Sequence, residues 1–110
     1  MMYKVRITRP AQTEMRGIYR HIAEELSNPI AAERRIALID EAIQSLKKNP
    51  ARFALVRDDY LASKGFRLIT VKNHLVLYII RENVHTVSVM RVLYGRRDWK
   101  RLLKVETEED

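Results

Sequence analysis

The segment from Gly65 to Trp99 constrains the fold most strongly, because it contains three apolar runs separated by short polar pairs. The runs are Phe66–Val71, His74–Arg81 and Val84–Tyr94. Their β-branched and aromatic residues suit a pleated, half-buried surface. Asparagine tolerates positive φ, so Lys72-Asn73 and Glu82-Asn83 can each close a tight hairpin. The segment therefore predicts a three-stranded antiparallel meander with the middle run as its central strand.

The middle run is apolar on both faces of this predicted sheet. Side chains alternate along a strand, so two sets of three point in opposite directions. The sets are Leu75, Leu77 and Ile79 on one face, and Val76, Tyr78 and Ile80 on the other. Both faces should be covered, and a partner protein is a candidate for one of the two covers.

Two helices are predicted before the meander. Residues 3–9 alternate apolar and polar side chains, which indicates a strand with one buried face. An apolar stripe at three- and four-residue steps then predicts a helix from Pro10 to about residue 26 or 27. Asn28 as N-cap and Pro29 as first residue are typical of a second helix, which reaches about Lys48. So short a link predicts an antiparallel helical hairpin.

The remaining segments complete the predicted order. Residues 50–64 are predicted to be a connecting loop, with a solvated turn at Arg57-Asp58-Asp59, and residues 96–104 one or two helical turns. The order is β-α-α-β-β-β plus a short C-terminal helix. A helical hairpin buries its stripe against one sheet face, so the predicted fold class is a two-layer α+β domain with a four-stranded, largely antiparallel sheet. We expect one domain over residues 1–103 and a frayed acidic tail over residues 104–110.

The charge of the chain is unevenly distributed. The net charge is +7, but residues 104–110 carry one Lys and four acids, so the other residues carry +10. A body this basic favours a polyanion or an acidic partner, although basic surfaces also serve solubility alone. No cysteine, no apolar core of signal-peptide length and no membrane-length apolar run is present. We expect a cytoplasmic protein that does not contact membranes.

Candidate chemistry is confined to basic and aromatic residues near the strand ends. The three histidines lack metal-ligand spacing, so neither a metal site nor a cofactor is predicted. Arg67 opens the first meander strand, Arg91 lies in the last, and Tyr94 ends it. Arginine forks match phosphate geometry and tyrosine can transfer a proton, so a metal-independent phosphodiester-cleaving site is conceivable. Equally, these arginines can hold acidic residues of another protein or face water.

The order and spacing of several stretches resemble the RelE/ParE superfamily, the toxin half of type II toxin–antitoxin modules. The resemblance covers roughly residues 3–103. It depends on YKVRIT followed by AQTEMRGIYRHIAEEL, then AAERRIALIDEAIQSLKKNP, GFR, HLVLYII and VHTVSVMRVLYGRRDW. The resemblance implies a helical hairpin on an antiparallel sheet whose first strand lies beside the last.

The superfamily contains two activities. RelE-like toxins cut mRNA in the ribosomal A site, whereas ParE-like toxins poison DNA gyrase. The GIYRHI and RVLYGRRDW stretches look more like ParE, which implies a gyrase poison. The alternative is a ribosome-dependent mRNA endoribonuclease, with Arg67, Arg91 and Tyr94 as its catalytic residues. Against it, Leu93 stands where one nuclease branch has histidine.

The resemblance also implies partners. A cognate antitoxin protein should neutralise the toxin in a hetero-oligomer, and we assign Val76, Tyr78 and Ile80 to its contact surface. The target is DNA gyrase, or the ribosome and mRNA. The residues assigned to target binding are Arg96, Arg97, Trp99, Leu102 and Leu103.

Overall fold

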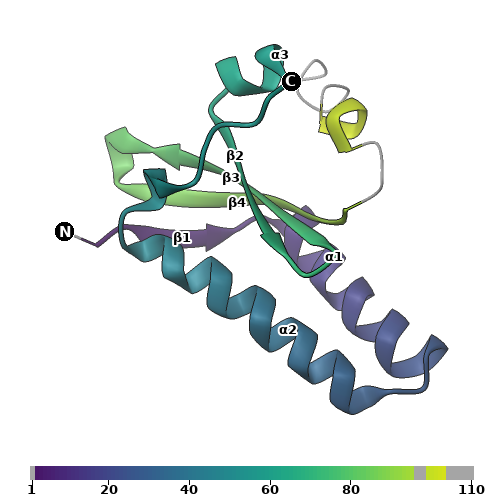
Figure 1. Cartoon of the computed structure of the whole chain (residues 1–110). Helices are drawn as coiled ribbons and strands as arrows, with labels where there is room; N and C mark the ends of the chain where they lie inside the picture. The colour runs from purple at the N-terminus through teal and green to yellow at the C-terminus, as the bar shows by residue number, and fades with distance from the viewer. Residues whose placement is uncertain (1, 96–98, 104–110) are drawn as a thin grey trace.

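The structure is a computed structural model in which residues 2–95 and 99–103 are described. The helices are α1 (Arg9–Arg20), α2 (Pro29–Gln44) and the short α3 (Asp59–Ser63), and the strands are β1 (Lys4–Ile7), β2 (Phe66–Val71), β3 (His74–Arg81) and β4 (Thr86–Tyr94). Residues 99–103 are also helical. Figure 1 shows α1 and α2 as a hairpin below the sheet, with α3 and the C-terminal helix above it. The predicted α+β class, with its four strands, helical hairpin and short last helix, is confirmed.

The sheet has the strand order β1-β4-β3-β2. β4 pairs antiparallel with β3, and β3 pairs antiparallel with β2, so the middle apolar run is a central strand as predicted. β1 joins the edge of β4 in parallel, with Val5 opposite Val87. The first strand therefore lies beside the last, as the family resemblance implies.

Both hairpins use left-handed residues other than the asparagines. Lys72 has φ 57° in the β2–β3 turn, and His85 has φ 49° just before β4. In the second connection Glu82–Val84 forms a 3₁₀ turn, which delays the start of β4 to Thr86. The prediction that Asn73 and Asn83 supply the positive φ is therefore wrong, although both turns lie where it placed them.

The helix ends follow capping chemistry. Thr8 Oγ1 accepts a hydrogen bond from the Ala11 N–H at 3.4 Å, and Asn28 Oδ1 accepts one from the Ala31 N–H at 3.1 Å. Each side chain satisfies a donor that lacks a partner within its helix. The start of α2 at Pro29 is thus confirmed. The first helix is shorter than expected, because α1 gives way at His21 to a π-helical turn.

The segment after the hairpin is more structured than the sequence suggested. Asp58 Oδ1 accepts a hydrogen bond from the Leu61 N–H at 3.0 Å, which makes Asp58 the N-cap of α3. Leu61 is fully buried. The predicted solvated turn at Arg57-Asp58-Asp59 is therefore wrong: the aspartates begin a helix that anchors this segment to the sheet.

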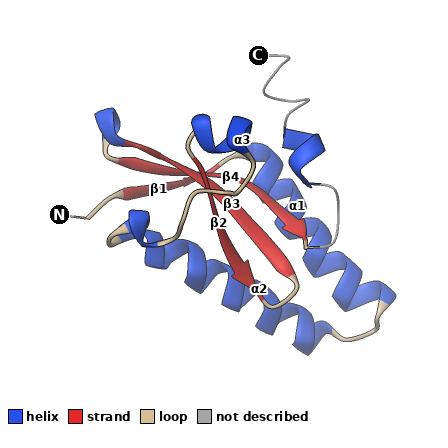
Figure 2. Cartoon of the chain, turned by 45° about the horizontal axis from the view of Figure 1, so that its top comes forward, coloured by secondary structure: helices blue, strands red, loops and turns tan. Residues whose placement is uncertain are grey.

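The chain itself covers both faces of β3 (Figure 2). On the hairpin side, Val76 and Tyr78 pack with Ile39 and Ile43 of α2. The opposite face has a second cluster of buried residues, namely Val56, Leu61, Phe66, Leu75, Leu77, Leu93 and Leu103. The hairpin of α1 and α2 thus covers one face of the sheet, and α3 with residues 99–103 covers part of the other.

This packing corrects the assignment of the antitoxin surface. Val76 and Tyr78 have no exposed surface, and Ile80 packs against the same cluster. A partner could reach Val76 and Tyr78 only by lifting the helical hairpin off the sheet, which would return a large apolar area to water. Val76 and Tyr78 belong to the core and Ile80 lies at its margin, so the chain itself covers the sheet face that we expected a partner to cover.

The buried hydroxyl of Tyr78 gives a test of this core. It donates to the Pro50 carbonyl oxygen at 2.6 Å, and burial raises the pKa of Tyr78, which keeps the donor protonated. Tyr78→Phe leaves that carbonyl without its partner, so the free energy of unfolding should fall by about 1–3 kcal/mol. Urea unfolding of the purified protein measures the change.

A matched control is Tyr19→Phe, because Tyr19 is partly exposed on α1. This second substitution should change the free energy of unfolding by less than about 0.5 kcal/mol. Equal losses in the two variants would contradict the structural role of the Tyr78 hydroxyl.

Candidate functional site

The far half of β4 contains most of the polar residues predicted to act in the site. β1 ends opposite Val89, so the edge of β4 beyond this point needs other partners. Thr8 supplies two of them: its N–H donates to the Val89 oxygen at 3.1 Å, and its hydroxyl donates to the Met90 oxygen at 3.0 Å. Met90 is the extra residue of a β-bulge, because Leu77 lies opposite Arg91 while Tyr78 lies opposite Val89.

Glu14 of α1 supplies the next partner of this edge. Its Oε1 accepts the Val92 N–H at 3.0 Å, and its Oε2 accepts from Arg91 Nε at 2.8 Å and Nη2 at 2.5 Å. The Arg91 and Glu14 side chains are only 14% and 20% exposed. Arg91 therefore has its charge balanced inside the fold, and it fastens α1 to β4.

Arg67 is also engaged by the chain itself. Its Nη1 donates to the Phe53 oxygen at 2.6 Å and to the Ala51 oxygen at 3.2 Å. Leu55 forms an antiparallel bridge with Arg67 beside this contact. The guanidinium thus holds the segment that runs along the free edge of β2.

The structure does not bring Arg67, Arg91 and Tyr94 together into one site. Across the sheet, Arg67 is in register with Tyr78 of β3. Tyr94 is in register with His74, which lies four residues before Tyr78, at the start of β3. That offset is about 13 Å along the strand. By alternation along β4, Arg91 also lies on the opposite face from Tyr94. A single phosphate cannot contact all three predicted catalytic residues.

A polar cluster that the sequence did not predict surrounds Tyr94 instead. The Tyr94 ring meets the edge of the His74 ring at 5.7 Å between centroids. Arg35 of α2 donates from Nη1 to Asn73 Oδ1 at 2.7 Å and lies 3.1 Å from His74 Nδ1. These residues meet only because the β2–β3 turn comes close to α2, and nothing in their sequence spacing signals it.

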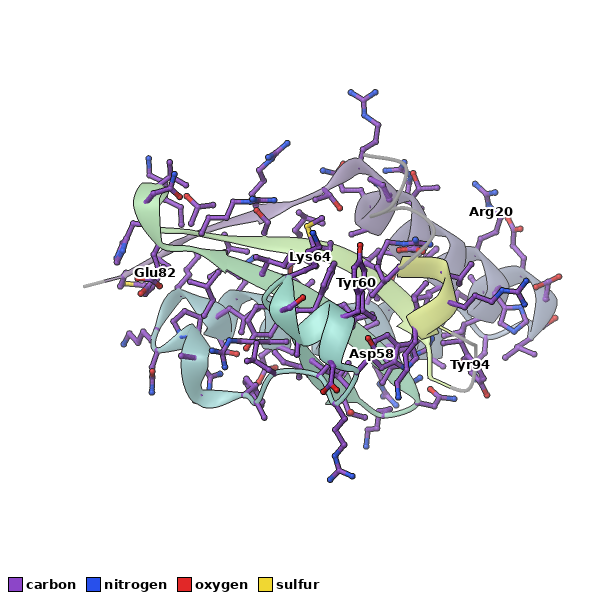
Figure 3. The ribbon with its side chains drawn as sticks, turned by 90° about the horizontal axis from the view of Figure 1, so that it is seen from above. Arg20, Asp58, Tyr60, Lys64, Glu82 and Tyr94 are labelled. Carbon is purple, nitrogen blue, oxygen red and sulfur yellow. The ribbon has the colours of Figure 1, made fainter. Side chains whose placement is uncertain are left out.

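The protonation of His74 follows from these contacts. Burial and the charge of Arg35 lower the pKa of His74, so its ring is neutral at neutral pH. Arginine has only donors, so Nδ1 accepts and Nε2 carries the proton. The cluster presents a cation, a neutral imidazole and a phenol that is 48% exposed. Figure 3 shows Tyr94 at the periphery of the molecule, at the end of β4.

The face opposite the helical hairpin has a shallow groove of about 240 Å³. Its lining residues are Ala54, Leu55, Val56, Arg57, Leu68, Trp99 and Lys100. Leu55 is 44% exposed here, and Leu102 on the neighbouring C-terminal helix is 40% exposed. The groove is therefore apolar at its base and cationic at its rim.

The residues predicted to bind a target have different environments. Trp99 is partly buried and lines the groove, Leu102 is exposed, and Leu103 is a core residue at 2% exposure. Arg96 and Arg97 lie outside the described residues. Within residues 2–95 and 99–103 no cluster of His, Asp or Glu could hold a metal ion, and no helix is long and apolar enough to cross a membrane.

Comparisons with known proteins identify the fold and the family of the chain. In a search of curated proteins nothing matches the chain. Among solved structures, the chromosomal ParDE toxin–antitoxin system of P. aeruginosa aligns with a TM-score of 0.70 at 19% identity, over 84% of this chain and 96% of that one. The RelBE2 toxin–antitoxin complex of Mycobacterium tuberculosis aligns with a TM-score of 0.64 at 24% identity, over 86% and 99%.

The free E. coli toxin RelE, in a mutant form, aligns over nearly its full length. Its TM-score is 0.70 at 13% identity, over 97% of this chain and 98% of that one. At these identities the structures show that the fold is shared. The sequence itself matches the family described as "ParE toxin of type II toxin-antitoxin system, parDE" over residues 5–99. The chain therefore belongs to the ParE toxin family of type II toxin–antitoxin systems.

Proposed function

We propose that this toxin arrests growth by poisoning DNA gyrase, and that it does so without cutting RNA. The observation that carries the proposal is the engagement of both candidate catalytic arginines, Arg67 by backbone carbonyls and Arg91 by Glu14. Metal-free cleavage of a phosphodiester needs cations that are free to balance the developing charge. The family match to ParE over residues 5–99 supports the same conclusion.

The energetic argument concerns Arg91. To hold a phosphate, Arg91 would have to release Glu14 and leave a carboxylate unpaired between α1 and β4. Breaking a fully buried pair by removing one partner costs about 3–5 kcal/mol. The pair here retains some exposure, so the cost is smaller, but it opposes phosphate binding at every turnover.

The alternative function is a RelE-like, ribosome-dependent mRNA endoribonuclease. One observation favours it, namely the cluster of Arg35, His74 and Tyr94 at the end of the sheet. Arg35 could approach a phosphate, and Tyr94 could transfer a proton. However, Arg35 occupies His74 Nδ1, and the lowered pKa of His74 disfavours an imidazolium, so Arg35 is the cation that these three side chains supply.

We further propose that a cognate antitoxin neutralises the toxin at the groove between residues 54–57 and the C-terminal helix. A segment that orders on binding needs buried apolar anchors, and Leu55, Leu68 and Trp99 offer them. Acidic antitoxin residues would approach Arg57 and Lys100 at the rim, chiefly speeding association. This groove replaces Val76, Tyr78 and Ile80 as the proposed antitoxin surface.

The first functional test removes one hydroxyl. Tyr94→Phe keeps the ring contact with His74 but removes the group that could transfer a proton. We expect full toxicity and unchanged gyrase–DNA cleavage complexes, because a poison does not need that proton. Growth after induction, a supercoiling assay and mapping of cellular mRNA ends provide the measurements. Loss of toxicity in a folded variant, together with loss of mRNA cuts, would establish the nuclease alternative.

The second functional test probes the surface beside the groove. Leu102→Ser removes an exposed apolar side chain from the C-terminal helix, where we place the contact with gyrase. We expect the concentration needed to trap cleavage complexes to rise about tenfold, the size of a modest hot-spot loss. Titration of the purified toxin into a gyrase cleavage reaction measures it.

Leu38→Ser is the matched control for that test. Leu38 is 39% exposed on α2, so the same chemical change occurs at nearly the same exposure on the other face. Gyrase trapping should be unaffected. If both variants poison gyrase as well as the parent, the contact lies away from the C-terminal helix.

A further inference from the structure

Three cations lie on the face of the sheet opposite the helical hairpin, at the end near the β3–β4 connection. Val5 and Ile7 pack into the hairpin-side core, so alternation turns Lys4 and Arg6 to the other face, where both are exposed. Ile80 packs into the same hairpin-side core, so Arg81 also points away from it, and it is exposed. In Figure 3, which looks down on this face, α3 and the C-terminal helix leave this end of the sheet open.

The strand register places these side chains in two adjacent rows. Lys4, Thr86 and Arg81 lie side by side across β1, β4 and β3, and Arg6, Ser88 and Ile79 form the next row. Neighbouring strands are about 4.8 Å apart, and residues two positions apart on one strand are separated by about 6.7 Å. The three cations therefore stand within one small area.

Arg81 contacts Ser88, which lies opposite Arg6 in the sheet register. Arg81 Nε donates to Ser88 Oγ at 3.1 Å, so the arginine reaches back across β4 toward the row that contains Arg6. Ser88 is only 1% exposed. Its oxygen accepts from Arg81, and within the described part of the chain its own O–H has no acceptor. A buried hydroxyl ordinarily finds one.

Among the described residues, no carboxylate forms an ion pair with Lys4, Arg6 or Arg81. The ion pairs among the described residues join Arg91 to Glu14 and His21 to Glu25. The nearest carboxylate in sequence, Glu82, accepts a hydrogen bond from the Tyr3 hydroxyl instead. Like charges held close without a counter-charge repel one another, and a bound anion removes that repulsion.

We propose that Arg6 and Arg81 form a phosphate-binding site for the backbone of duplex DNA, with the buried Ser88 hydroxyl holding Arg81 in place and Lys4 on the neighbouring phosphate. Guanidinium forks match the geometry of phosphate oxygens. An acidic peptide fits less well, because the described side chains of the two rows offer it little more than Ile79 as an apolar anchor. The inference deepens the proposed function, since gyrase acts on DNA.

The test measures binding of a short fluorescent DNA duplex to the isolated full-length chain by anisotropy over a series of salt concentrations. The double variant Arg6→Gln/Arg81→Gln should bind about ten- to a hundredfold more weakly, as expected for the loss of charge-assisted hydrogen bonds. The slope of log affinity against log salt should fall by about 1.8, since each phosphate contact contributes about 0.9.

The matched control is Arg20→Gln/Arg34→Gln. It removes the same charge from exposed positions on α1 and α2, on the other side of the molecule. Its affinity for DNA should change by less than about threefold, and its salt slope should stay that of the parent. Ser88→Ala provides an independent variant that keeps the net charge and should also weaken binding.

Three outcomes would overturn the inference. The first is an equal loss of DNA affinity in Arg6→Gln/Arg81→Gln and in the control Arg20→Gln/Arg34→Gln, which would show a general effect of charge. The second is an unchanged slope of log affinity against log salt in Arg6→Gln/Arg81→Gln. The third is that Arg6→Gln/Arg81→Gln loses binding to a polyglutamate peptide but keeps its affinity for DNA, which would show that the site binds an acidic protein. Because no gyrase is present, a failure here leaves the proposed poisoning mechanism standing, and the reverse also holds.

Discussion

The Glu14 carboxylate is the contact on which the arrangement of this toxin depends. It takes over the edge of β4 where β1 stops, and it balances Arg91 at the same time. One side chain thus joins the helical hairpin to the sheet and accepts from the Val92 N–H, a backbone donor that would otherwise need water. The same contact supports the proposed function, because an arginine that holds α1 in place is not free to bind a substrate phosphate.

The two faces of the sheet consequently serve different purposes. The hairpin face is core, with Val76 and Tyr78 sealed beneath α2. The opposite face is divided between a groove near Leu68 and Trp99, which is apolar at its base, and a cationic end around Arg6, Ser88 and Arg81. The proposed antitoxin groove and the proposed phosphate site therefore lie on one surface, so an antitoxin bound in the groove would also obstruct a large nucleoprotein target.

Much of the fold could be predicted from the sequence, because periodicity and caps are local signals. The bounds of β2 and β3, the N-cap at Asn28 and the central place of the middle run all follow from side-chain pattern. The role of Asp58 as a helix cap was missed, since two adjacent aspartates also suit a solvated turn. The left-handed residues were misplaced for a similar reason: asparagine is the commoner choice, but Lys72 and His85 adopt that conformation here.

The candidate site was harder to predict, because the contacts of its arginines are made with residues distant in the chain. Arg91 meets Glu14 across 77 positions, and Arg67 meets the Phe53 carbonyl across 14. No spacing rule identifies such pairs, so free and committed arginines look alike in a sequence. The cluster of Arg35 with His74 has the same origin, because it forms where a turn between strands meets a helix.

The segment held by Arg67 affects whether the edge of β2 can pair with other molecules. β2 is an outer strand of the sheet, and an outer strand with unpaired amides is a template for joining further strands from other molecules. Leu55 and Val56 occupy part of that border, pairing with Arg67 and Phe66. Arg67, which we assigned to a catalytic site, thus holds a segment that covers part of this outer strand and leaves less of its edge open to pairing with another copy of the protein.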